Sequence, residues 1–381
     1  MTVPQWIIPD QLFDGETLRA GIAVLLAGGH VVDIQPAATL PPATSARKVA
    51  GLLTPGFVDL QVNGGGDVLL NLNPTVAGMA TMAAAHRRFG TVAILPTVIT
   101  DAPEVLDRAA KAALAAKGQT GIIGLHIEGP HISVARRGTH AERFVRPLDD
   151  RTITIVQTLR RAAIPVKITL APEAVQPGQI AALAATGAIV SIGHSDTTAA
   201  IVRLALAEGA SCFTHLFNAM SPMLNRAAGV VGAAINSIAC AGIICDGIHV
   251  ADEMVGLAIR ARPVRDTMFL VSDAMSTVGG SDHYTLYGQT VWLRDGRLVN
   301  SEGSLAGAHI TMAQSVQRLI NVVGVPAEVA LRMAVTVPAR LIGRPDLATI
   351  AGRAMADLVL LDAQFGASPF ADHLALTKAR V

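Results

Sequence analysis

Residues 188–195 read AIVSIGHS, residues 211–217 read SCFTHLF, residues 241–250 read AGIICDGIHV and residues 267–274 read TMFLVSDA. Each segment contains a short apolar run that is typical of a buried strand. A polar residue follows each run: His194, His215, His249 and Asp273. Because the carboxyl ends of parallel barrel strands meet at one mouth, these residues predict a single site. Glu128, at the end of GIIGLHIE, repeats the pattern upstream.

Four further apolar runs lie before this stretch. They are LLTPGFVDLQV (52–62), TVAILPTVI (91–99), GIIGLHIE (121–128) and PVKITLAPE (165–173). Ala-rich segments of helical length and period lie between the strand candidates, at residues 75–90, 103–118, 151–163 and 197–209. Eight strands alternating with helices over roughly 290 residues predict a (β/α)8 TIM barrel. A doubly wound open sheet is the alternative, although the GxGxxG and GxxxxGK[ST] signatures of nucleotide folds are absent.

The two chain ends have a different pattern from the middle. GIAVLLAGGHVVDIQ (21–35) predicts two strands joined by a Gly-Gly turn, and DLVLLD (357–362) predicts another strand. Residues 1 to about 50 alone have too few apolar residues for a stable core. We therefore expect a small β-sandwich domain built from residues 1–53 and 345–381, with the barrel at 54–344.

The composition excludes several classes of protein. Of the 381 residues, 51% are apolar, 15% are charged and 3% are aromatic, and the net charge is +1, which argues against nucleic-acid or acidic-membrane partners. Cys212, Cys240 and Cys245 form no CxxC pair, so we expect free thiols and a cytoplasmic enzyme. The first residues lack the pattern of a signal peptide. The uncharged residues 227–245 predict a helix and a core strand, because glycines interrupt them.

The strand-end residues indicate metal chemistry. Glu128, His194 and His215 supply one carboxylate and two imidazoles, which leaves a coordination position for water as in a catalytic zinc site. A metal there can lower the pKa of a bound water to about 7 and polarise a carbonyl. Asp273 would then take the proton of that water and pass it to the leaving nitrogen. A helix N-cap is the alternative role for Asp273.

His140 and Arg226 each have two possible roles. His140 lies in the loop after the third strand, where it is either a lid or substrate contact or a solvated loop residue. Arg226 lies in the loop after the sixth strand and is either a phosphate ligand, with His249 as a second contact, or a surface arginine. His126 and His131 are expected to be structural or to support the site. We do not expect metal ligation from the remaining histidines: His30, His86, His283, His309 and His373.

Eight motifs together resemble one known family. They are GFVDLQVNG, GLHIEGPH, RRGTH, IGHSDTT, THLFNAMSPMLNR, CDGIHV, LVSDAM and GSLAGAHITM. In this order, from about Pro55 to Met312, they resemble the N-acetylglucosamine-6-phosphate deacetylase family of the amidohydrolase superfamily. That family cleaves the acetamide of N-acetylglucosamine 6-phosphate to give glucosamine 6-phosphate and acetate.

The resemblance implies a role for each matching residue. It implies that Glu128, His194 and His215 bind a metal and that Asp273 is the general base and acid. It also implies that His140 polarises the substrate carbonyl and that Asn218 and the Ala219 backbone contact the substrate. The same resemblance implies phosphate binding by Arg226 and His249. Because one phosphate contact in the family comes from a neighbouring subunit, a homodimer is expected.

One departure from the wider superfamily concerns the metal count. Many members have His-x-His after the first strand for a second metal, whereas this chain has Gln61-Val62-Asn63. Amide side chains are poor zinc ligands beside imidazole, so we predict a single divalent ion. Zinc is the first candidate, with iron, cobalt and manganese as alternatives. A lysine at the end of the fourth strand could bridge two metals as a carbamate, but this chain has none there, because Lys167 lies too early in VKITLAPE.

Other activities remain open at this point. The nearest is the same chemistry on N-acetylgalactosamine 6-phosphate or an N-acyl amino acid. A non-catalytic barrel that binds a phosphosugar or stores metal is a rival of another class, but binding requires no proton carrier such as Asp273. An aldolase would need a Schiff-base lysine at a strand end, and none is placed there.

Overall fold

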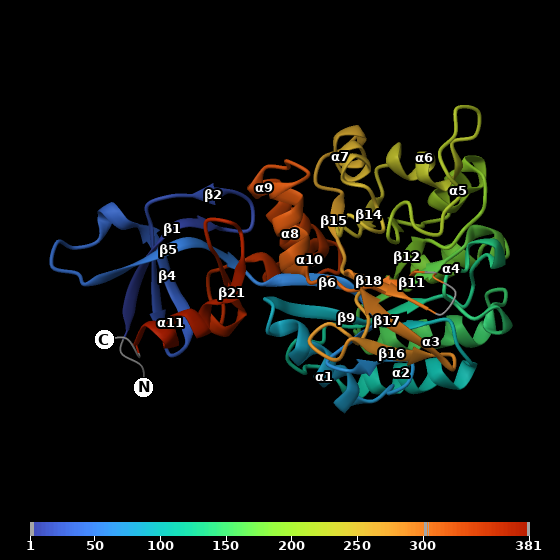
Figure 1. The fold of residues 1–381 in the computed structure, drawn as a ribbon, viewed down its shortest axis with the longest axis horizontal. Helices are drawn as coiled ribbons and strands as arrows, with labels where there is room; N and C mark the ends of the chain where they lie inside the picture. The colour runs from blue at the N-terminus through green and yellow to red at the C-terminus, as the bar shows by residue number, and fades with distance from the viewer. Residues whose placement is uncertain (1–3, 301–302, 304, 379–381) are drawn as a thin grey trace.

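The computed structural model describes residues 4–300, 303 and 305–378. Eight parallel strands form the larger part of the molecule (Figure 1). Along the chain they are β6 (Phe57–Val62), β9 (Thr91–Ile99), β10 (Leu125–Glu128), β11 (Val166–Leu170), β12 (Ile189–Ile192), β13 (Cys212–Phe213), β14 (Cys240–Ile243) and β15 (Met268–Leu270). Neighbouring strands pair in this same order, from β6 through to β15.

The first and last strands close the barrel. The backbone N–H of Asp273 donates to the carbonyl of Gln61 at 3.0 Å, and the N–H of Asn63 donates to the carbonyl of Ala274 at 2.9 Å. Val62 and Ala274 form a parallel bridge. The predicted TIM barrel is therefore confirmed, and the open-sheet alternative is wrong.

Helices alternate with these strands as the sequence predicts. Those that fall in the four predicted segments are α1 (Val76–Arg87), α2 (Pro103–Ala115), α3 (Asp150–Arg161) and α5 (Ala199–Ala207). The others around the barrel are α4 (Gln179–Ala185), α6 (Gly229–Ile235), α7 (Asp252–Ala261), α8 (Met312–Asn321), α9 (Ala327–Leu331) and α10 (Val337–Leu341). Side chains cap several N-termini: Thr75, Asp149 and Thr198 each accept a hydrogen bond from a backbone N–H of the first turn.

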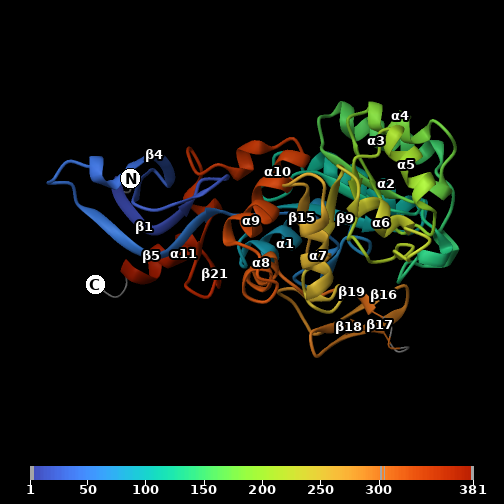
Figure 2. The ribbon, with the colours of Figure 1, turned by 90° about the horizontal axis from the view of Figure 1, so that it is seen from above.

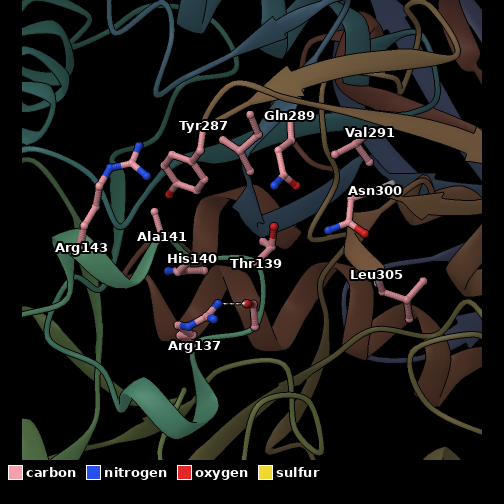
Figure 3. A pocket seen from close by; sticks show the side chains of 12 residues that line it. Arg137, Thr139, His140, Ala141, Arg143, Tyr287, Gln289, Val291, Asn300 and Leu305 are labelled. Atoms are coloured by element: carbon pink, nitrogen blue, oxygen red, sulfur yellow. Dashed lines mark hydrogen bonds between the residues drawn. The ribbon is translucent and has the colours of Figure 1, made fainter. Parts of the chain in front are cut away.

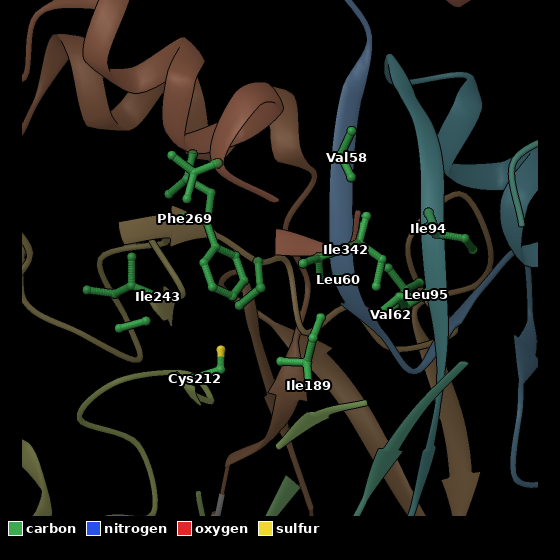
Figure 4. Close-up of a cluster of buried hydrophobic side chains, with 14 of the residues drawn as sticks. Val58, Leu60, Val62, Ile94, Leu95, Ile189, Cys212, Ile243, Phe269 and Ile342 are labelled. Carbon is green, nitrogen blue, oxygen red and sulfur yellow. The ribbon is translucent and has the colours of Figure 1, made fainter. Parts of the chain in front are cut away.

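The apolar runs that predict the strands supply side chains to a buried core (Figure 4). Leu60, Leu95, Ile243 and Phe269 come from four different strands and are fully buried. Burial of each such side chain stabilises the fold by about 1.5–3 kcal/mol relative to leaving it exposed. The strand ends at the mouth are therefore anchored on a packed core.

Both chain ends build the smaller β domain, as expected, but its described strands form one sheet and not the two sheets of the expected sandwich. One continuous sheet contains β1 (Gln5–Phe13), β2 (Leu18–Arg19), β3 (Ile22–Ala27), β4 (His30–Pro36), β5 (Ala46–Pro55), β20 (Leu358–Leu361) and β21 (Ala367–Pro369). The final helix, α11 (Phe370–Lys378), follows β21. Gly28 and Gly29 make the predicted turn with φ values of 58° and 81°. The domain limits at residues 53/54 and 344/345 stay a prediction.

The run LLTPGFVDLQV differs from the expectation of one barrel strand. Its first part ends β5 of the small domain, and its second part is β6 of the barrel. Gly56 separates them, and a Cβ there would lie 2.3 Å from Val92. The prediction merged the two strands because both parts of the run are apolar.

A four-stranded antiparallel sheet after β15 was not predicted. Its strands are β16 (His283–Leu286), β17 (Gln289–Arg294), β18 (Arg297–Val299) and β19 (Leu305–Ala308). Figure 2 shows it projecting from the barrel. The end of β19 is attached to the barrel, because the N–H of Ala308 donates to the carbonyl of Asp273 at 3.1 Å. The strands are only three to six residues long, so the alternation of buried and exposed residues gives a short sequence signal.

The uncharged residues 227–245 form helix α6 and strand β14, as the sequence predicts. In the part of the chain that the structure describes, no helix has the length and hydropathy needed to cross a bilayer. Cys212, Cys240 and Cys245 are free thiols, as expected.

Candidate metal centre and active site

Glu128, His194 and His215 converge at the barrel mouth. Glu128 ends β10, and each histidine lies two residues beyond the end of its strand, β12 or β13. The Oε1 atom of Glu128 is 3.0 Å from Nε2 of His215 and 3.5 Å from Nε2 of His194. The two Nε2 atoms are 3.0 Å apart. All three side chains are buried, and one ligand atom from each lies within 4.8 Å of the others.

The orientation of this triad fits a divalent ion. The Nδ1 atom of His194 lies 2.9 Å from the carbonyl of Arg136, so it donates there and leaves the Nε2 lone pair directed at the cluster. His194 and His215 both have left-handed backbones, with φ values of 49° and 31°. Such a conformation costs about 1–3 kcal/mol in a non-glycine residue and is typical of functional sites.

The pKa shifts of Glu128 and His215 also fit a divalent ion. Burial alone would raise the pKa of Glu128, but hydrogen bonds to His194 and His215 outweigh burial and hold that pKa well below its usual range. Burial would lower the pKa of His215, but the hydrogen bond to Glu128 and its charge raise it instead. A buried carboxylate is thus kept anionic by cationic or hydrogen-bonding neighbours, and a divalent ion would fill the same role.

Asp273 lies beside the triad and is held by two amide side chains. The Nε2 atom of Gln61 donates to Oε1 of Glu128 at 2.9 Å and to Oδ1 of Asp273 at 3.0 Å. The Nδ2 atom of Asn63 donates to the same Oδ1 at 2.7 Å. Burial raises the pKa of Asp273, the charge of Glu128 raises it further, and the Asn63 bond acts in the opposite direction. The residues after Asp273 form a turn and no helix, so the N-cap alternative is wrong.

His140 is brought into the site from the loop after β10. Its side chain is 3% exposed, so the solvated-loop alternative is wrong. The Nδ1 atom lies 2.7 Å from Oγ1 of Thr100, and the imidazole centroid lies 4.4 Å from that of His194. Burial, and then the charge of His194, lower the pKa of His140 to about 3. The ring is therefore neutral near pH 7 and can present an N–H to a carbonyl oxygen.

A cavity of 180 Å³ contains the triad, Asp273 and His140. Asn218, Ala219 and His249 also line it. The Nδ1 atom of His249 lies 2.6 Å from a carboxylate oxygen of Asp246, which fixes the orientation of the imidazole.

Arg226 is not brought into this cavity. It is exposed in the loop between Ala219 and α6 and is absent from the residues that line the cavity within the described chain. A role for Arg226 in this site therefore requires a second copy of the chain or a movement of the loop.

The other two central histidines are held by threonine hydroxyls, which agrees with the expectation that they are structural or support the site. His126 has Nδ1 3.1 Å from Oγ1 of Thr97 and Nε2 2.7 Å from Oγ1 of Thr169. His131 has Nε2 2.9 Å from Oγ1 of Thr152.

Sequence reasoning missed several residues that complete the site. From the sequence, Gln61 and Asn63 indicate only the absence of a second metal site, and no role is predicted for Asp246. Leu305 and Gly307 come from the unpredicted sheet, at β19, and line the cavity. The position of Asp246, three residues before His249, is a signal that could have been used.

The fold and the site together define a metal-dependent hydrolase. The chain belongs to the amidohydrolase family, whose model matches residues 52–378. Members of this superfamily use a divalent metal, and the Glu128, His194 and His215 cluster fits one. The resemblance drawn from the motifs is thus confirmed at the level of the family, and the protein is a hydrolytic deacetylase.

The chain is similar to several proteins of known activity or structure. The chain is 43% identical over 320 residues to N-acetylgalactosamine-6-phosphate deacetylase of Shewanella sp., covering 83% of this chain and 80% of the relative. It is 32% identical over 331 residues to N-acetylglucosamine-6-phosphate deacetylase of Haemophilus influenzae, covering 85% and 86%. The solved structure of the N-acetylglucosamine-6-phosphate deacetylase of Pasteurella multocida superposes with a TM-score of 0.87 at 34% identity, covering 96% of this chain and 97% of that one.

Proposed function

We propose that the protein hydrolyses the acetamide of N-acetyl-D-glucosamine 6-phosphate to D-glucosamine 6-phosphate and acetate. The observation that carries the proposal is the buried Glu128, His194 and His215 cluster with Asp273 beside it in one cavity. The names of the relatives supply the substrate class.

The chain's own residues divide the work of this reaction. Glu128, His194 and His215 would hold one divalent ion, zinc in the first instance. When bound, that ion would polarise the amide carbonyl and acidify a water molecule. Asp273 takes a proton from the attacking water and delivers it to the leaving nitrogen. Gln61 and Asn63 would fix the carboxylate of Asp273 for both steps.

His140 acts on the carbonyl oxygen in this proposal. The ring is neutral, and its Nδ1 atom is engaged with Thr100, so Nε2 is the atom that meets the substrate. Stabilisation of the developing oxyanion by a positioned donor is usually a large part of the rate enhancement in amide hydrolysis.

The phosphate would bind at the opposite side of the cavity. His249 and Asn218 follow neighbouring strands, β14 and β13, and line the cavity with Ala219. Arg226 would reach the phosphate from a second subunit, so we expect a homodimer. Met223 and Leu224, in the same loop, are 45% and 60% exposed and would be covered by that subunit. The three free thiols suit a reducing compartment such as the cytoplasm.

One observation favours a second substrate. Identity to the N-acetylgalactosamine-6-phosphate deacetylase is 43%, compared with 32% to the N-acetylglucosamine-6-phosphate enzyme of H. influenzae. The second candidate is therefore the same hydrolysis of the 4-epimer, N-acetyl-D-galactosamine 6-phosphate.

Acetate release tests the proposal. The enzyme is assayed on both hexosamine 6-phosphates and on both unphosphorylated sugars, with and without a chelator. We expect chelator-sensitive release from the glucosamine derivative and a large preference for the phosphorylated form. Equal or better turnover of the plain sugars would refute the phosphate assignment. Release from the galactosamine derivative alone would select the second candidate, and release from none would favour a binding protein.

A further inference from the structure

A second chamber of 450 Å³ opens beside the metal cavity. It lies between the loop that carries His140 and the antiparallel sheet β16–β19 (Figure 3). Gly138, Thr139, His140 and Leu305 line both spaces, so the two adjoin at the residue that would contact the substrate carbonyl.

The chamber lies on the side of the mouth away from the proposed phosphate site. Asn218 and His249 follow β13 and β14, whereas the His140 loop follows β10. In the barrel order, β11 and β12 lie between these two sides. Tyr287, which lines the chamber, donates through its hydroxyl to the carbonyl of Thr100, directly after β9. The chamber therefore faces the β9–β10 side.

The geometry of an amide directs its acyl chain toward this chamber. The carbonyl carbon has three substituents in one plane. In the proposed function the nitrogen would lead to the sugar and its phosphate, toward Asn218 and His249, and the oxygen would meet His140 and the metal cluster. The third substituent, the acyl chain, would then extend away from the phosphate side, where Leu305 borders both spaces.

Two cationic and two amide side chains line the chamber. They are Arg137, Arg143, Gln289 and Asn300 (Figure 3). The guanidinium of Arg143 stacks over the ring of Phe144, 4.6 Å from its centroid. Arg137 contacts Glu142 at 3.4 Å, but both side chains are well exposed, so this pair is weak and replaceable.

The volumes of the metal cavity and the chamber are consistent with one substrate that occupies both. Ligand pockets usually measure about 300–1,000 Å³. The metal cavity, at 180 Å³, is below that range, while the chamber, at 450 Å³, is within it. An acetyl group alone would leave most of the chamber unused.

We propose that this chamber is a second anion subsite, which binds the terminal carboxylate of an acyl group longer than acetyl. The substrate class is a hexosamine 6-phosphate whose nitrogen carries a dicarboxylic half-amide, such as N-succinyl. Water adds to the amide carbon, the C–N bond breaks, and the nitrogen takes the proton, giving the amino sugar and a dicarboxylate. This inference rests on the proposed deacetylase activity at the same metal cluster.

The test compares three N-acyl derivatives of glucosamine 6-phosphate: acetyl, succinyl and succinamoyl. Succinamoyl has the shape of succinyl without its charge, so the ratio of their kcat/KM values isolates the carboxylate. Because charge-assisted hydrogen bonds are the strong ones, we expect the wild type to prefer succinyl by about tenfold or more. Arg137→Gln and Arg143→Gln should each reduce that preference, and the double variant should abolish it. Arg151→Gln, an exposed arginine paired with Asp107 outside both spaces, is the matched control and should keep it.

The outcomes separate this inference from the function on which it rests. A wild type that releases acetate but turns over succinyl and succinamoyl equally would overturn the inference and leave the proposed function standing. A preference that survives in the folded double variant would also overturn it. Equal rises in KM for all three derivatives in the arginine variants would overturn it by indicating that the chamber holds the sugar phosphate. A wild type that releases no acetate would overturn the proposed function itself.

Discussion

Replacement of Asn63 by leucine should shift the pH dependence of the reaction. Asn63 donates to Oδ1 of Asp273 at 2.7 Å, and its own Oδ1 has no hydrogen-bond partner among the described residues. Asn63→Leu therefore removes one donor from the carboxylate at similar volume and leaves no donor of another residue unpaired. A hydrogen bond to a charged group contributes about 1.5–3 kcal/mol. Since one pKa unit corresponds to about 1.36 kcal/mol, loss of this bond should raise the pKa of Asp273 by about 1–2 units.

The sign of the effect follows from the role of Asp273. It must be a carboxylate to accept a proton, so activity rises with pH through its pKa. Burial already raises this pKa, and the Asn63 bond opposes that shift. In Asn63→Leu the acid limb of the kcat/KM profile should therefore move to higher pH by about 1–2 units, with about a tenfold to hundredfold loss on that limb and recovery at higher pH.

A matched control tests whether the shift is specific. Asn71→Leu removes another buried amide, which donates to the carbonyl of Ile99 at 3.0 Å and does not contact Asp273. That variant should keep the wild-type acid limb. An acid limb at the same pH in folded Asn63→Leu and in the wild type would refute the assignment of Asp273 as the base held by Asn63.

Three further measurements follow from the structure. Burial lowers the pKa of His86 from 6.5 to about 4, so the free energy of unfolding should fall by about 3 kcal/mol as the pH falls from 6.5 to 4. His86→Gln should remove that loss in urea unfolding, and an unchanged pH dependence in the variant would contradict the prediction. Asp246→Ala frees the imidazole of His249 and should raise KM for the phosphorylated sugar by about tenfold, because a charge-assisted bond is lost. KM for the plain sugar should change little. An equal rise in KM for both sugars would argue against a phosphate contact by His249. Metal analysis should return one divalent ion per chain, and two full equivalents would contradict the single-site prediction.

The ligand cluster was predictable because its signal is local. An apolar run that ends in a polar residue is visible in the sequence, and barrel closure brings such ends together. For this reason the sequence placed Glu128, His194 and His215 correctly at strand ends. The Gly-Gly turn of the small domain was predictable for a similar reason, because only glycine adopts left-handed conformations readily.

The contacts around the cluster could not be predicted in the same way. An amide such as Gln61 can donate to any acceptor in reach, and its partners, Glu128 and Asp273, lie 67 and 212 residues away along the chain. The sheet β16–β19 has short strands with one exposed face, so its pattern resembles that of a loop. Arg226 lies in an exposed loop outside the cavity, so its proposed phosphate contact stays a prediction.

Asp273→Asn tests the central claim most directly. The amide keeps the size of the side chain but accepts no proton, so general base catalysis should be lost, at a cost of about 10²–10⁴-fold in turnover. The account predicts a folded variant that retains one divalent ion per chain and releases acetate from N-acetylglucosamine 6-phosphate at a rate reduced to that extent. A folded, metal-loaded variant with near wild-type acetate release would contradict it.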